Sequence, residues 1–67
     1  GKNCIINSGA IIEHDVIIGN NVHIAPGAIV LGGCNIQENS FIGSGTVLKQ
    51  NTILTKETIL SSGKYFK

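Results

Sequence analysis

A single apolar position recurs every six residues along almost the whole chain. A helix repeats its apolar positions about every 3.6 residues and a strand alternates every two residues, so neither element explains this period. Short strands separated by regular turns do explain it, and a fixed period indicates a repeat architecture. The recurring residues are Ile6, Ile12, Ile18, Ile24, Val30, Ile36, Ile42, Leu48, Leu54, Leu60 and Phe66.

The residues that occupy one position of every hexad form a column. Two further columns distinguish strand from turn. Two residues before each aliphatic residue stands a small one, and this spacing points both columns to the same interior. Three residues after it, nine of ten positions hold Gly, Asn or Asp, which tolerate positive φ. We therefore expect one bend per hexad. The small column is Cys4, Ala10, Val16, Val22, Ala28, Cys34, Ser40, Thr46, Thr52 and Thr58. The corner column is Gly9, Asp15, Asn21, Gly27, Gly33, Asn39, Gly45, Asn51, Glu57 and Gly63.

Three bends would close a triangular coil, and successive coils would stack as parallel strands about 4.8 Å apart. The sequence thus predicts an all-β fold, a parallel β-helix of roughly three and a half coils formed as one domain over residues 1–67. The period does not set the handedness of the coil, and crossovers between parallel strands are normally right-handed.

The residue before each aliphatic one should point outward, and nine of these eleven residues are apolar or aromatic. A soluble monomer rarely exposes so much contiguous apolar surface, so we expect the outer faces to pack against other copies of the chain. The alternative is that Ile and Val stand there only for their strand propensity. The outward column is Ile5, Ile11, Ile17, His23, Ile29, Asn35, Phe41, Val47, Ile53, Ile59 and Tyr65.

Charge and hydropathy argue against two classes of partner. The formal net charge is +1, and Lys49, Lys56, Lys64 and Lys67 are scattered without interleaved aromatic residues, which does not suggest a nucleic-acid surface. No run of about eighteen apolar residues and no signal-peptide pattern suggests a membrane or secretion.

The two cysteines, Cys4 and Cys34, stand five hexads apart in the small column. They should lie on different faces and about 8 Å apart in height, which is more than a disulfide tolerates. The sequence predicts two free thiols and a reducing, cytoplasmic setting.

Candidate chemistry centres on the two histidines. His14 lies in the corner segment Glu13-His14-Asp15, and Gly32 and Gly33 follow one coil later, so a cleft could open beside its imidazole. A neutral imidazole beside a carboxylate is a competent general base. Asp15 and Glu13 are both candidates to orient it, although Asp15 also fits the corner column and Glu13 also reads as a solvated charge.

His23 interrupts the apolar outward column. It follows His14 by nine residues, half of one coil, so the two lie on opposite sides of the prism and share no site within one chain. In a trimer, a corner of one subunit could face the flat side of the next. The two histidines could then line one cleft between subunits.

The runs Ile18-Gly19-Asn20-Asn21-Val22 and Ile42-Gly43-Ser44-Gly45-Thr46 resemble the hexapeptide-repeat, left-handed β-helix family. Residues 6–15, 22–28 and 32–33 more specifically resemble the C-terminal acetyltransferase domain of the sialic acid O-acetyltransferase and UDP-amino-sugar N-acetyltransferase family. The resemblance implies a left-handed coil, a homotrimer, acetyl-CoA as co-substrate and a small-molecule sugar as acceptor.

The resemblance also implies roles for single residues. It makes His14 the general base and Asp15 the acid that increases its basicity. His23 matches a position that contacts acetyl-CoA, and Ser44 and Ser62 match positions whose backbone groups do so. Asn7 falls near the acceptor, and with Glu13 forms the expected substrate-binding pair. The implied mechanism is direct transfer in a ternary complex, without a cysteine or serine nucleophile.

Two parts of that family's pattern are missing from this sequence: the N-terminal Rossmann-like domain and the C-terminal tail. We therefore expect a fragment, and a catalytically incomplete trimeric scaffold is the alternative to a working acetyltransferase. A remoter alternative is a metal site like that of γ-class carbonic anhydrases, in which three histidines hold zinc. This chain has two histidines, so we expect no metal.

Overall fold

The computed structural model describes residues 1–63 and 65–66, and their secondary structure consists of short strands and turns. Every described strand is two residues long and consists of one outward-column residue followed by one aliphatic-column residue. In the described residues the strands are β1 (Ile5–Ile6), β2 (Ile11–Ile12), β3 (Ile17–Ile18), β4 (His23–Ile24), β5 (Ile29–Val30), β6 (Asn35–Ile36), β7 (Phe41–Ile42), β8 (Val47–Leu48), β9 (Ile53–Leu54), β10 (Ile59–Leu60) and β11 (Tyr65–Phe66).

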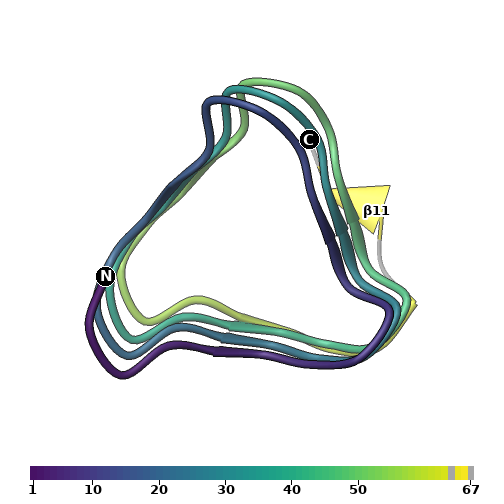
Figure 1. The fold of residues 1–67 in the computed structure, drawn as a ribbon, viewed down its shortest axis with the longest axis horizontal. Coiled ribbons are helices and arrows are strands. Elements are labelled where there is room, and N and C mark those ends of the chain that lie inside the picture. Colours follow the sequence, from purple (N-terminus) through teal and green to yellow (C-terminus); the bar gives the residue numbers. More distant parts are fainter. Residues whose placement is uncertain (64, 67) are drawn as a thin grey trace.

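The strands form the three flat sides of a triangular prism (Figure 1). In the described residues, face A contains β1, β4, β7 and β10, face B contains β2, β5, β8 and β11, and face C contains β3, β6 and β9. All pairs are parallel, and each residue pairs with the one eighteen positions later, as Ile6 does with Ile24. The coil length and the parallel stacking are therefore confirmed.

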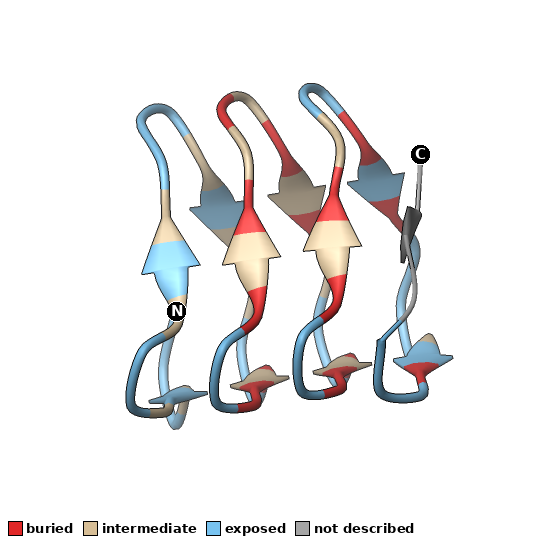
Figure 2. Ribbon diagram, turned by 90° about the vertical axis from the view of Figure 1, so that its right-hand side faces the viewer, coloured by how far each residue is buried: buried red, intermediate tan, exposed pale blue. Residues whose placement is uncertain are grey.

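The coil is left-handed. Seen from its N-terminal end, the chain runs anticlockwise around the prism in Figure 1, and Figure 2 shows that it moves away from that viewpoint as it does so. The handedness matches the expectation drawn from the family resemblance and departs from the usual right-handed rule for parallel crossovers.

The interior is filled by the two columns assigned to it. Aliphatic side chains from β4 to β9 are buried to 1% exposure or less. The same column is more open in the first coil, where Ile6 is 50% exposed. Figure 2 shows this gradient as a pale first coil beside coils with red interior positions. The orientation of the column is thus confirmed, and the first coil buries it less than the later coils do.

The small column also makes hydrogen bonds that sequence analysis did not anticipate. Ser40 Oγ donates to the Thr55 carbonyl and Thr46 Oγ1 to the Ser61 carbonyl, both over 3.2 Å. Cys34 Sγ donates in the same way to the Lys49 carbonyl over 3.0 Å. In each case the acceptor carbonyl belongs to a residue fifteen positions later, in the third corner after the donor. Thr52 and Thr58 of the same column donate instead to the carbonyls three residues earlier, those of Lys49 and Thr55.

Cys4 and Cys34 are both free thiols, as predicted. The Cys4 Sγ donates to the Gly19 carbonyl over 3.1 Å, again fifteen residues later. Each thiol is therefore held by a backbone carbonyl rather than by the other cysteine.

All ten predicted corner residues have positive φ. Asn3, with φ 57°, extends the column one hexad toward the N-terminus. Glu57 adopts φ 61° although it is neither Gly, Asn nor Asp, a conformation that costs an ordinary L-residue about 1 to 2 kcal/mol. The turn geometry of the repeat thus outweighs the local preference of this residue.

Some sequence-based observations lie outside what the structure describes. The charges of Lys64 and Lys67 and the side chains of Tyr65 and Phe66 are among them. Within the described part of the chain, no helix is long and apolar enough to cross a membrane.

Candidate functional site

The first group of candidate residues lies at the corner between faces B and C. This B/C corner consists of residues 13–15, 31–33 and 49–51. His14 Nδ1 lies 3.2 Å from Asp15 Oδ2, and both side chains are largely exposed. An ionised carboxylate only accepts hydrogen bonds, so the neutral imidazole carries its proton on Nδ1 and leaves Nε2 with a lone pair. Asp15 also has φ 59°, so it serves the turn and the imidazole together.

The His14 ring lies against the backbone of Gly32 in the next coil. A Cβ placed on Gly32 would stand 2.9 Å from His14 Cε1 and 3.1 Å from Nε2. A Cβ on Gly33 would collide with the Asn51 side chain, which comes from the coil beyond. His14 and Asn51 therefore fill the space that the two glycines leave. This space is not the open cleft that the sequence predicted beside the imidazole.

A hollow of about 440 Å³ lies farther along the same corner. It is lined by Leu31, Lys49, Gln50 and Asn51. Gln50 and Asn51 occupy the positions of His14 and Asp15 two coils later. Sequence analysis did not predict this hollow. The repeat could have located it, because the residues two coils after the segment 13–15 are Lys49, Gln50 and Asn51.

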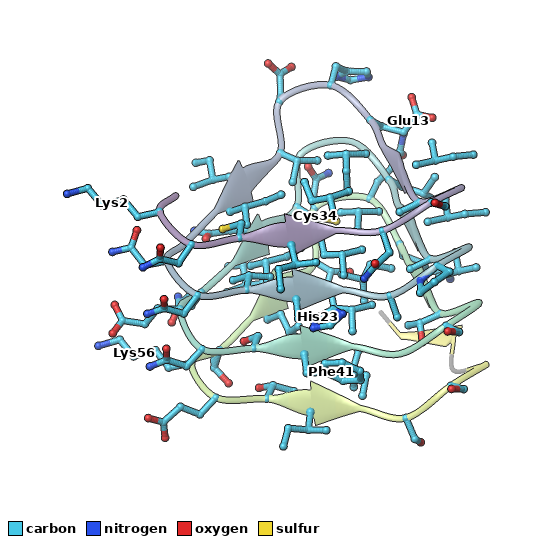
Figure 3. All side chains as sticks on the ribbon, turned by 60° about the horizontal axis from the view of Figure 1, so that its bottom comes forward. Lys2, Glu13, His23, Cys34, Phe41 and Lys56 are labelled. Atoms are coloured by element: carbon cyan, nitrogen blue, oxygen red, sulfur yellow. The ribbon has the colours of Figure 1, made fainter. Side chains whose placement is uncertain are left out.

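The second group of candidate residues lies on face A and at its junction with face B. His23 projects from β4 on face A and is half-buried. Asn7 Nδ2 lies 2.8 Å from His23 Nε2, and Phe41 on β7 meets the imidazole edge to face with ring centroids 4.9 Å apart. Figure 3 shows His23 and Phe41 projecting from neighbouring strands of one face. Phe41 lies directly opposite His23 in the next coil, whereas Asn7 lies diagonally across from it in the preceding coil. Comparing residues within single columns does not reveal these contacts.

Ser44 and Ser62 stack at the corner between faces A and B. This A/B corner consists of residues 7–9, 25–27, 43–45 and 61–63. Both serines are exposed, and the Ser44 carbonyl accepts a hydrogen bond from Gly63 N over 2.7 Å. A Cβ on Gly43 would stand 2.6 Å from the Ser62 backbone nitrogen, so only glycine permits this close stacking of coils.

The structure therefore divides the predicted site residues into two groups. Asn7, His23, Ser44 and Ser62 belong to face A and the A/B corner, whereas the segment 13–15 belongs to the B/C corner. Figure 3 shows Glu13 on the far projecting corner and His23 on the near face. As the half-coil spacing predicted, no single chain joins the two groups.

Substituting Gly32 by alanine tests how His14 is held. The new Cβ would enter the space of an exposed ring, so we expect the imidazole to rotate away from Asp15 while the melting temperature changes little. NMR shifts of the imidazole measure this displacement. Gly45→Ala is the control, because a Cβ there meets no described atom within 4 Å but φ is +70°. It should cost about 1 kcal/mol of stability and leave the His14 signals unchanged. Unchanged His14 signals in Gly32→Ala would contradict the assignment.

No group of three His, Cys, Asp or Glu side chains within the described residues could hold a metal ion. The His14–Asp15 contact brings two such side chains together.

Comparison with known proteins matches the first part of the chain to a family model. The model is described as bacterial transferase hexapeptide (six repeats), and it covers residues 1–32. This range includes Asn7, both histidines and Gly32. No solved structure matches the chain. The chain thus folds as a β-helix with a six-residue repeat, and its first 32 residues are similar to a family of bacterial hexapeptide transferases.

Proposed function

We propose that the protein is an acyltransferase core that transfers an acetyl group from acetyl-CoA to an amine or hydroxyl of an amino sugar or sialic acid. The observation that carries the proposal is the His14–Asp15 pair, in which Nδ1 faces a carboxylate over 3.2 Å. The pair stands exposed on a corner, where a small molecule can reach Nε2. The transferase family match over residues 1–32 supports the same class of reaction.

The proposed mechanism uses His14 as general base. Nε2 takes the proton from the acceptor nitrogen or oxygen as that atom attacks the thioester carbonyl carbon. The tetrahedral intermediate then collapses, the carbon–sulfur bond breaks, and the imidazolium returns the proton to the leaving thiolate. Asp15 stabilises the imidazolium formed between these steps. Cys4 and Cys34 take no part, because their thiols point inward and donate hydrogen bonds to the backbone carbonyls of Gly19 and Lys49.

The proposed working unit is a homotrimer in which a B/C corner faces face A of the next subunit. Two observations support it: the separation of His14 from His23, and the large exposed side chains of the outward column. The exposed outward isoleucines are Ile5, Ile11, Ile17, Ile53 and Ile59. In this arrangement His23, Ser44 and Ser62 bind acetyl-CoA from one subunit, and Asn7 and Glu13 lie near the acceptor. The free thiols support a reducing, cytoplasmic setting.

Calorimetric titration with acetyl-CoA tests the proposal most directly. We expect saturable binding at one site per chain, and thiol release when an amino-sugar acceptor is added. Sedimentation in the same buffer should give the mass of three chains. A folded protein that binds no acetyl-CoA would reject the proposal and favour the second candidate, a trimeric β-helix scaffold, which the exposed apolar faces alone would support.

A further inference from the structure

The amide of Asn7 makes two contacts at once. Its Nδ2 lies 2.8 Å from His23 Nε2 and donates to the Ile24 carbonyl oxygen over 3.3 Å. An amide nitrogen has two protons and an amide oxygen has none, so the two contacts together define which way round the amide sits. If the amide were turned over, its oxygen would face the Ile24 carbonyl oxygen, and two acceptors would repel each other.

This orientation determines the state of His23. One amide proton points to the Ile24 carbonyl, and the other points to His23 Nε2. Because Nδ2 can only donate, Nε2 must accept, and a neutral imidazole that accepts at Nε2 carries its proton on Nδ1. Among the residues that the structure describes, none bonds to Nδ1 of His23, so its proton is available to a ligand.

We propose that Asn7 is a positioning residue, which holds His23 as the Nδ1–H tautomer and so makes it a hydrogen-bond donor to a carbonyl oxygen of the acyl donor. This assignment of the ligand rests on the proposed function. Phe41 supports it by packing against the ring with centroids 4.9 Å apart, which restricts rotation of the imidazole. The two histidines thus have opposite roles: His14 presents a lone pair and His23 presents a proton.

The two tautomers can be distinguished by nitrogen-15 NMR of the imidazole. The His14→Ala background is suitable, because only two histidines are present and His23 then gives the only signals. At alkaline pH, where the ring is neutral, we expect a protonated Nδ1 and an unprotonated Nε2. Asn7→Ala removes the donor and should allow both tautomers. Asn7→Asp supplies an acceptor and should move the proton to Nε2.

Asn35→Asp is the matched control, because Asn35 lies on β6 of face C and receives the same change of charge. It should leave the His23 tautomer as in the parent. A parent protein with its proton on Nε2, or a tautomer that does not respond to either Asn7 substitution, would overturn the proposal.

Acetyl-CoA affinity tests the ligand separately. In a protein with His14 intact, Asn7→Asp, which moves the proton to Nε2, should weaken acetyl-CoA binding about tenfold, the loss expected for one neutral hydrogen bond. Asn7→Ala, which leaves part of the population as the Nδ1–H tautomer, should weaken binding less than Asn7→Asp does. Unchanged affinity with an altered tautomer would overturn the assignment of His23 as donor to the acyl carbonyl. If the parent binds no acetyl-CoA while its tautomer is the expected one, the proposed function fails and the role of Asn7 in holding His23 stands.

Discussion

Replacing His14 by alanine is expected to lower the rate of acetyl transfer about a hundredfold or more, the usual contribution of a general base. The physical reason is that no other described side chain presents a base at this corner beside a carboxylate. Binding of acetyl-CoA should change little, because the base acts on the acceptor. Steady-state assays of thiol release, together with calorimetry, separate these two effects.

Glu38→Ala is the control for this substitution. Glu38 is exposed and holds the same position in its hexad as His14, two residues after the aliphatic residue, but at the corner between faces C and A. Its replacement should leave transfer and folding unchanged. Near-normal turnover of His14→Ala, or an equal loss in Glu38→Ala, would reject His14 as the base.

The same variant tests whether the site is shared between chains. His14→Ala and His23→Ala proteins should each be impaired alone. When they are refolded together in equal amounts, about a quarter of the interfaces should combine an intact His14 with an intact His23 from the neighbour. Recovered activity of that order supports a site between subunits. A mixture that exchanges subunits but recovers no activity would contradict it.

Replacing Ile36 by alanine is expected to destabilise the fold by about 2 to 5 kcal/mol, the range observed for buried Leu, Ile and Met truncations. Ile36 lies on β6 in the middle of the prism and has no exposed surface, and coils on both sides prevent the cavity from collapsing. A single core of this size supplies stability of only about 3 to 5 kcal/mol. The variant should therefore be largely unfolded by circular dichroism at room temperature.

Ile53→Ala provides the comparison on the same face. Ile53 on β9 points outward and is 63% exposed, so its truncation should change the stability of a single chain by about 0.5 kcal/mol or less. If face C is covered in an oligomer, the loss should instead depend on protein concentration. Equal losses for Ile36→Ala and Ile53→Ala at all concentrations would contradict the assignment of inward and outward columns.

Much of the fold could be predicted because every hexad places the same types of residue at the same strand and turn positions. Nine of the ten corner residues fit their positions by type, and Glu57, placed there by spacing alone, follows the pattern against its own preference. Burial was predicted less well at Ile6, because the column specifies the direction of a side chain and not the number of coils that cover it. The carbonyl partners of Cys34 and Ser40 were missed because they lie fifteen residues away rather than one full coil.

The candidate site was predicted in its residues but not in its contacts. The His14–Asp15 pair follows from adjacency in the chain, and the structure contains it. The open space expected beside Gly32 was wrong in detail, because the imidazole itself packs on that glycine. The Asn7–His23 contact joins residues sixteen apart, a diagonal across two coils that no column comparison reveals.

The sequence by itself determined the coil length, the inward and outward columns, the corner residues and the separation of the two histidines. These properties follow from a repeat, because each hexad meets the same steric limits on φ and the same alternation of side-chain direction. Only the tertiary structure decided that His14 rests on Gly32 and that the Asn7 amide contacts both His23 Nε2 and the Ile24 carbonyl. Those features depend on side-chain rotation and on contacts between coils, and both are settled only when the coils stack.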